Sequence, residues 1–188
     1  MQTRDHTLLG RYLLASCDAE PDPVCRRMFL LGCIEPDWNL ATYARGSIKH
    51  RLLHGHNAEN ARGHLRHLTE KLLESGVGTP LQWFRFGAAL HYLADSFTFA
   101  HNQCFAGTLA EHRLYEKLLH SVFAEYLYPR NVKITPSEEF THEQYLQERR
   151  SFLTDCRYIL GASIALWHQL SILQAMPKPI RCLALQEL

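Results

Sequence analysis

The chain has 188 residues, of which 46% are hydrophobic and 21% charged, and its formal net charge at pH 7 is +1. These values are typical of one soluble globular domain with a single core. The small net charge gives no reason to expect a nucleic-acid partner, which would favour a clearly basic face. No stretch approaches the roughly eighteen apolar residues of a membrane-spanning helix.

The N-terminal stretch MQTRDHTLLGRYLLASC lacks a basic segment followed by a sustained apolar run. We therefore expect no signal peptide and a cytoplasmic location, or a secreted one if the chain is a processed form. The six cysteines form no C-x-x-C pair, which favours reduced core thiols over a disulfide framework. Twelve histidines against three methionines are an excess, and imidazole is the commonest metal ligand.

Helical periodicity dominates the first half of the chain, and no alternating strand pattern of useful length occurs. We predict one helix over residues 3–16 and a second from Pro21 or Pro23 to about Gly32. A long loop then covers residues 33–57, where Pro36, Gly46 and Gly55 interrupt the pattern. Such a long connection is usually functional or disordered, and its aromatic and histidine content favours an ordered functional loop.

The second half of the chain is also predicted to be helical. The expected helices run from Asn57 to about Glu74, from the cap Thr79 and Pro80 to about His101, from Gly107-Thr108 to Pro129, and over about 138–176. The fold class is therefore an all-α, single-domain multi-helix bundle over residues 1–176, with a tail over 177–188.

The stretch HYLADSFTFAH places three polar groups in an otherwise apolar helix. His91 and Asp95 are four residues apart and so lie on one helical face, where they can share an ion. His101 lies six residues beyond Asp95, about 120° around the helix, and suits a neighbouring ion better.

The next helix repeats the four-residue spacing, because EHRLYEKLLH puts His112, Glu116 and His120 on one stripe. Either pair alone arises by chance or as a structural ion pair. Both pairs together, with Asp37 and a histidine-rich loop, favour a site for several metal ions with nitrogen and oxygen ligands. The H-E-x-x-H pattern of zinc proteases and a contiguous His-Asp pair are both absent.

These segments resemble, in order, the motifs of the bacterial zinc-dependent phospholipase C family. ALHYLADSFTFAHNQCF is similar to its L-H-Y-x-x-D-x-x-x-P-x-H signature, and the other matches are His6, EPDWN, IKHRLLHGHN and EHRLYE. The fungal single-strand zinc nucleases share this all-α, three-zinc architecture. The resemblance therefore implies a fold and a metal centre, without fixing the substrate.

Carried over position by position, the resemblance implies two to three zinc ions. The first is held by Asp37, His50, His91 and Asp95, the second by His101, His112 and Glu116, and the third by His6 with Asp95 as a bridge. His54 and His56 compete with His50 as the loop ligand. In the family the third metal also takes the amine of an N-terminal tryptophan. With Met1 in this chain, the third site uses the Met1 amine, is incomplete or is absent.

The activity that the resemblance implies is phosphodiester hydrolysis, in which a metal-activated water attacks the phosphorus of a phospholipid or related phosphodiester. Asp37 is expected to orient or deprotonate that water, and Trp38 either binds a quaternary amine through cation–π contact or packs. Two alternatives stay open: a zinc nuclease-like hydrolase, and a non-catalytic zinc-binding helical protein with a structural or partner-binding role. The main departure from the motif is Phe99, where the family has proline.

Overall fold

The computed structural model describes residues 1–16, 21–39, 58–128 and 139–175. Its helices are α1 (Thr3–Ser16), α2 (Pro23–Trp38), α3 (Ala58–Ser75), α4 (Pro80–Ser96), the short 3₁₀ helix η3 (Phe99–His101), α5 (Leu109–Leu127), α6 (His142–Gln147) and α7 (Phe152–Ala175). No strand occurs in these residues, so the predicted all-α fold is confirmed. The expected boundary before the tail lies outside them and stays a prediction.

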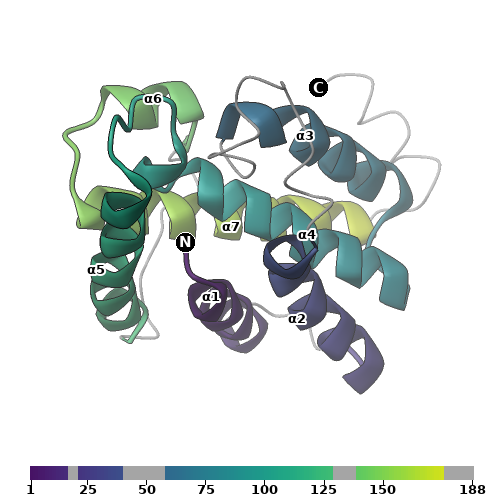
Figure 1. The fold of residues 1–188 in the computed structure, drawn as a ribbon. Coiled ribbons are helices and arrows are strands. Elements are labelled where there is room, and N and C mark those ends of the chain that lie inside the picture. Colours follow the sequence, from purple (N-terminus) through teal and green to yellow (C-terminus); the bar gives the residue numbers. More distant parts are fainter. Residues whose placement is uncertain (17–20, 40–57, 129–138, 176–188) are drawn as a thin grey trace.

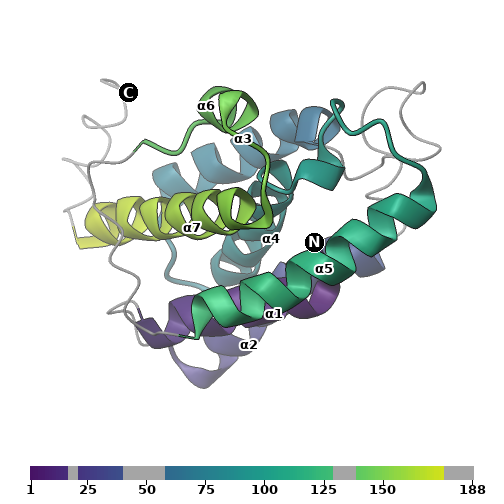
Figure 2. The same cartoon turned by 90° about the vertical axis from the view of Figure 1, so that its left-hand side faces the viewer.

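Helix α4 is the centre of the bundle, and α2, α3 and α7 all pack against it (Figure 1). An aromatic cluster joins three of these helices, since the rings of Phe29, Trp83, Phe86 and Trp167 lie within 6 Å of one another. Helix α5 lies beside α1 and also packs on α7 (Figure 2). Met1 therefore lies where α1, α4 and α5 approach one another (Figure 1).

The close crossing of α2 and α4 depends on two glycines. A Cβ atom on Gly32 would lie 2.0 Å from the carbonyl oxygen of Phe84, and one on Gly87 would lie 2.1 Å from that of Phe29. Any side chain at either position would therefore push the two helices apart. This close approach brings the last turns of α2 against the histidine-bearing turn of α4.

The predicted end of the second helix near Gly32 is wrong. Helix α2 continues to Trp38 with Pro36 inside it, although proline removes one backbone hydrogen bond and disfavours a helix interior. Cys33 and Pro36 are both buried in the continued segment. Packing of the apolar face of α2 on α4 outweighs the lost bond, so Asp37 belongs to the last helical turn and not to a loop.

Two predicted helices are each divided in the structure. The helix from Pro80 ends at Ser96, and a separate 3₁₀ turn carries His101. The expected helix over 138–176 consists of α6 and α7, because Ser151 accepts a hydrogen bond from the Thr154 N–H and starts a new helix. That capping serine was the signal in the sequence that could have located the second break.

Other boundaries agree closely with the prediction. Helix α1 has the predicted ends, and Thr79 and Thr108 cap α4 and α5 through reciprocal bonds with Gln82 and Glu111. Of the four cysteines in the described residues, Cys104 is exposed and so departs from the expected core position; the other three are buried.

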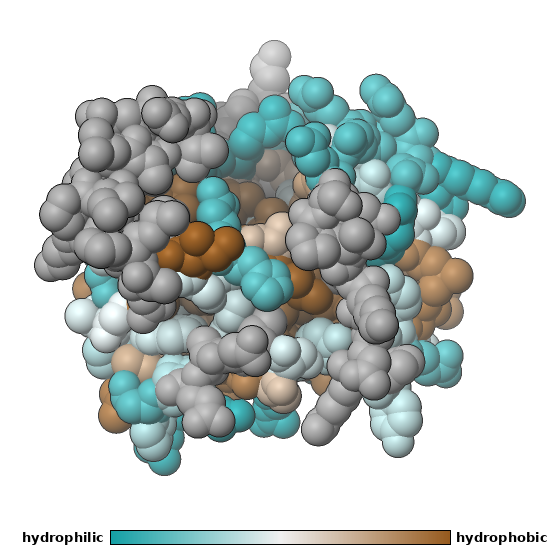
Figure 3. All heavy atoms as spheres, turned by 180° about the vertical axis from the view of Figure 1, so that it is seen from behind, coloured by the Kyte–Doolittle hydropathy of each residue, from teal (hydrophilic) through white to brown (hydrophobic). Residues whose placement is uncertain are grey.

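The surface opposite the view of Figure 1 carries its hydrophobic residues in separate small groups among hydrophilic ones (Figure 3). Scattered exposed apolar residues are ordinary for a globular protein. In the described part of the chain, no helix is both long and apolar enough to cross a membrane.

Candidate metal centre

Six ligand-type side chains form two groups where α1, α4, η3 and α5 meet. The first group is His6, His91 and Asp95, and the second is His101, His112 and Glu116. Within each group, one potential ligand atom per residue lies within 4.8 Å of the others. Donors that share one ion at metal–ligand distances of about 2.0–2.2 Å lie at most about 4.4 Å apart, so the atoms of each group lie close to the spacing of a metal site.

The first group is wholly buried, and each of its three residues is 1% exposed. His6 comes from the first turn of α1, whereas His91 and Asp95 lie one turn apart on α4. The two imidazole rings stack with centroids 3.8 Å apart, and Asp95 lies 3.3 Å from the Nε2 atom of each. Both histidines therefore direct Nε2 towards one carboxylate.

The orientation of His91 is fixed from its other side. Its Nδ1 atom lies 2.9 Å from the carbonyl oxygen of Cys33 on α2. A carbonyl only accepts, so Nδ1 carries the proton and donates, and Nε2 faces Asp95 and Asp37. A metal-ligating histidine is typically held in this way by a backbone carbonyl.

Burial and neighbouring charges shift the pKa values of the first group in different directions. Burial lowers the pKa of His6, and the nearby His91 lowers it further. Burial also opposes charging of His91, but Asp95 outweighs it and the pKa rises. Burial would raise the pKa of Asp95, yet His101, the Met1 ammonium and His91 hold it well below its usual value. Asp95 is therefore an anion at neutral pH.

The second group is more open to solvent. The side chains of His101, His112 and Glu116 are 8%, 18% and 15% exposed, respectively. Glu116 Oε1 lies 3.0 Å from His101 Nε2 and 3.4 Å from His112 Nε2. Although burial opposes its ionisation, hydrogen bonds from the two histidines hold the pKa of Glu116 well below its usual value.

The α-amino group of Met1 lies between the two groups. Its nitrogen is 2.8 Å from Asp95 Oδ1, 2.9 Å from His101 Nε2 and 3.2 Å from Glu116 Oε1. Burial alone would lower the pKa of this amine, but the carboxylates of Asp95 and Glu116 raise it to about 10. The amine is thus a cation at neutral pH and neutralises part of the carboxylate charge.

The polar atoms of the first group fit a cation. Among the described residues, neither ring nitrogen of His6 makes a hydrogen bond, and nor does Asp95 Oδ2. Buried polar atoms are normally paired, because an unmade hydrogen bond costs about 1–3 kcal/mol. Imidazole nitrogens and a carboxylate that converge in this way match the ligand preference of zinc.

The remaining predicted site residues lie around these groups or outside the described residues. Asp37 Oδ1 is 3.6 Å from His91 Nε2, and its Oδ2 accepts a hydrogen bond from Thr3 Oγ1 at 2.7 Å. Trp38 ends α2 and is 71% exposed, so it is not a packing residue. His50, with its competitors His54 and His56, lies outside the described residues.

Asp5 is a buried residue of the centre that the sequence reasoning overlooked. Its Oδ2 atom accepts the N–H of Gln2 at 3.1 Å, and its Oδ1 atom pairs closely with His120 Nδ1 on α5. This pair ties the first turn of α1 to α5, and so gives His120 a partner other than a metal. The only sequence signal was the position of Asp5 next to His6.

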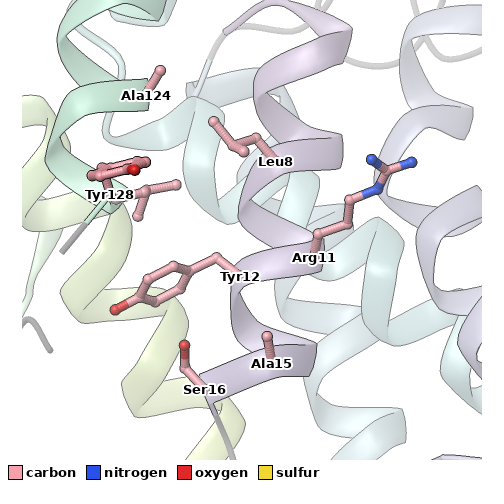
Figure 4. Close-up of a pocket in the computed structure, with 8 residues that line it drawn as sticks. Leu8, Arg11, Tyr12, Ala15, Ser16, Ala124 and Tyr128 are labelled. Carbon is pink, nitrogen blue, oxygen red and sulfur yellow. The ribbon is translucent and has the colours of Figure 1, made fainter. Parts of the chain in front are cut away.

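A separate groove lies between the far ends of α1 and α5. Its volume is about 560 Å³, and its lining includes Leu8, Arg11, Tyr12 and Tyr128 (Figure 4). No residue of either ligand group lines it. The groove is therefore distinct from the candidate metal centre.

Comparison with known proteins agrees with the site. A family model described as zinc dependent phospholipase C matches residues 6–164, which include all six grouped side chains. Searches of curated proteins and of solved structures gave no significant match. The matched region covers most of the sequence, and the chain belongs to the zinc-dependent phospholipase C family.

Proposed function

We propose that this protein is a zinc-dependent phosphodiester hydrolase of the phospholipase C type, acting on a phospholipid or a related phosphodiester. The observation that carries the proposal is the convergence of His6, His91 and Asp95 next to His101, His112 and Glu116 in a member of this family. Structural zinc sites are usually closed and rich in thiolate. These two groups contain only imidazole and carboxylate ligands, which favours catalysis.

The proposed ligands are arranged around Asp95. We assign His91, Asp95 and Asp37 to one ion, with His50, or its competitors His54 or His56, completing the set as the family resemblance implies. His101, His112 and Glu116 belong to a second. His6 and Asp95, with the amine of Met1 at 2.8 Å from Asp95, are proposed for a third. When bound, zinc supplies positive charge for phosphoryl oxygens and lowers the pKa of water.

Asp37 is the proposed general base. Its side chain is 19% exposed, so solvent reaches it, whereas the neighbouring His91 side chain is fully buried. Thr3 donates a hydrogen bond to Oδ2 and fixes the rotation of the carboxylate, while Oδ1 faces the first ligand group. A carboxylate held in this way can accept a proton from an attacking water.

Protons occupy the centre in the absence of metal. The Met1 ammonium lies against the carboxylates of Asp95 and Glu116, and the pKa of His91 is raised by Asp95. Metal ligands must be deprotonated to bind. We therefore infer that loading with zinc displaces protons from this set of residues, and that zinc affinity falls as the pH is lowered.

Trp38 is the proposed contact for the head group. Its side chain is largely exposed, and it follows the proposed base Asp37 in the last turn of α2. An aromatic face binds a quaternary ammonium by cation–π attraction. This favours a choline-type head group over a neutral one.

The proposal is tested by counting zinc and assaying a substrate panel on one preparation. Elemental analysis should give two to three zinc ions per chain. The wild type should cleave bis-p-nitrophenyl phosphate or phosphatidylcholine, and Asp37→Asn should lose most turnover while keeping at least two zinc ions. Chain without zinc contradicts the proposal. Zinc-loaded chain inactive on phosphodiesters favours the non-catalytic alternative, and cleavage of single-stranded DNA alone favours the nuclease-like one.

A further inference from the structure

Asp155 is a buried carboxylate that none of the proposed chemistry uses. It lies in the first turn of α7, is 1% exposed, and accepts three hydrogen bonds from three different elements. Its Oδ2 atom accepts the backbone N–H of Phe99 at 3.1 Å and the hydroxyl of Tyr115 at 2.8 Å. Its Oδ1 atom accepts the hydroxyl of Tyr145 at 2.8 Å.

Two of these donors stand next to proposed zinc ligands. Phe99 begins η3, which ends at His101, and Tyr115 directly precedes Glu116 on α5. The ligands of the second group thus come from two elements that are separate in sequence. One carboxylate on a third element binds both of them.

The bond to Phe99 has a specific cause. The first N–H groups of a helix have no partner inside the helix. Proline suits this first position because it has no N–H, and phenylalanine introduces a donor that needs an acceptor. The structure supplies Asp155 as that acceptor.

The ring of Phe99 adds a second connection to α5. It packs against Phe105 and Tyr115, with centroids 5.4 and 5.8 Å away, and the guanidinium of Arg150 lies 4.3 Å from its centroid. Phe105 in turn lies 6.0 Å from the ring of His112. The packing around Phe99 therefore extends to a second side chain of the same ligand group.

We propose that Asp155 is the positioning residue of the second ligand group, because it holds the His101 turn and the Glu116 turn at a fixed distance from each other. The inference rests on the proposed function only in treating these side chains as zinc ligands. Because the first group draws its residues from α1 and α4, Asp155 should have no direct influence on it.

The test measures zinc binding and not hydrolysis. Zinc affinity of each site is determined by chelator competition on apo-protein, and the sites are assigned with His6→Gln and Glu116→Gln. Asp155→Leu, which removes all three acceptor bonds, should weaken the second site by about 10–100-fold, as loss of a group that orients metal ligands typically does. Affinity at the first site should change by less than about threefold.

A control variant separates positioning from general destabilisation. Leu170 is buried on α7, fifteen residues beyond Asp155, and Leu170→Ala should lower the guanidinium concentration at which the protein unfolds. Its zinc affinities should equal those of the wild type. If Leu170→Ala weakens the second site as much as Asp155→Leu, or if Asp155→Leu binds zinc like the wild type, the inference is wrong.

A pair of backgrounds isolates the bond to the Phe99 N–H. Phe99→Ala and Phe99→Pro both remove the ring, but only proline also removes the donor. Asp155→Leu should therefore weaken zinc binding at the second site less when residue 99 is proline than when it is alanine. The two fold-changes in affinity should differ by at least about threefold. If Asp155→Leu weakens zinc binding equally in both backgrounds, the bond to the Phe99 N–H does not contribute to positioning the second group.

A milder variant covers the case in which Asp155→Leu does not fold. Tyr115→Phe removes only the link to α5 and should weaken the second site severalfold; unchanged affinity counts against the inference.

Failure of the proposed function gives a different pattern from failure of this inference. If the wild-type protein binds zinc but cleaves no phosphodiester, only the proposed function is contradicted. If the wild type is active and Asp155→Leu does not change zinc affinity, only the inference is contradicted.

Discussion

The two ligand groups lie side by side, but they differ in how they are enclosed. His6, His91 and Asp95 are each 1% exposed, and their orientation is fixed by ring stacking and by the Cys33 carbonyl. In the second group, His112 and Glu116 keep 18% and 15% of their side chains exposed, and the support comes from Asp155 behind them. The first group is built into the core, whereas the second is partly exposed to solvent.

We expect this difference to affect how each group exchanges an ion. A wholly buried set of ligands keeps an ion away from solvent and from chelators, which favours tight retention. A partly exposed set lets solvent reach an ion, which favours faster exchange. Asp95 connects the two, since it lies 3.3 Å from His6 and His91 and 3.6 Å from His101.

The largest effect is expected for Asp95→Asn, because this change removes the carboxylate that the two groups share. We expect loss of at least one zinc ion per chain together with a fall in turnover of more than about 100-fold. Without metal, the Met1 ammonium also loses its buried partner, which should reduce the free energy of unfolding by about 3–5 kcal/mol. Full zinc content and turnover in this variant would show that the two groups do not depend on Asp95.

A smaller effect is expected from pH, and it concerns only the support of the second group. Burial raises the pKa of Asp155 to about 6, against an ordinary value of 3.8, while the donors from Phe99, Tyr145 and Tyr115 limit the increase. The folded state therefore holds the proton more tightly than the unfolded state. The protonated carboxyl of Asp155 therefore contributes stability to the folded state. This contribution is fully present below pH 3.8 and is lost as the pH rises through about 6.

Asp155→Asn, which does not titrate, reveals this contribution. Both proteins are unfolded with guanidinium, without metal, at several pH values between 4 and 7. Over this range the free energy of unfolding of the Asp155→Asn variant should rise relative to that of the wild type by up to about 3 kcal/mol. A constant difference between the two proteins over this range would mean that Asp155 has an ordinary pKa.

Metal removal should distinguish the two groups directly. With a chromophoric chelator in excess, zinc should leave in two phases, and the phase from the exposed group should be about tenfold faster or more. Glu116→Gln should abolish the fast phase, and His6→Gln should reduce the slow one. Release in a single phase from the wild type would contradict the view that burial separates the two groups.

The smallest effect is expected for Trp38→Ala, at the exposed edge of the first group. A cation–π contact at an exposed position is worth about 0.5–1 kcal/mol, which corresponds to a rise in KM of about twofold to fivefold for a choline phosphodiester. For bis-p-nitrophenyl phosphate, which has no cation, KM should not change. An equal change for both substrates would contradict cation–π recognition by Trp38.

Local sequence signals predicted much of this molecule. The ends of α1, the threonine caps of α4 and α5, and the four-residue spacings of His91 with Asp95 and His112 with Glu116 all follow from interactions within a few residues. The family motif then predicted which histidines gather. The loop ligand at residues 50–56 stays a prediction, since it lies outside the described residues.

What the sequence could not predict depends on partners that are distant along the chain. Packing on α4 carries α2 past Pro36 to Asp37, and the Cys33 carbonyl that orients His91 is 58 residues away from it. Phe99 illustrates the same point, because its consequence for His101 depends on Asp155, 56 residues later. Periodicity and capping residues determined the helices, and the residue types at the four-residue spacings determined the kinds of ligand. Helix packing decided that one group is buried and the other partly exposed, because packing depends on contacts that no local pattern encodes.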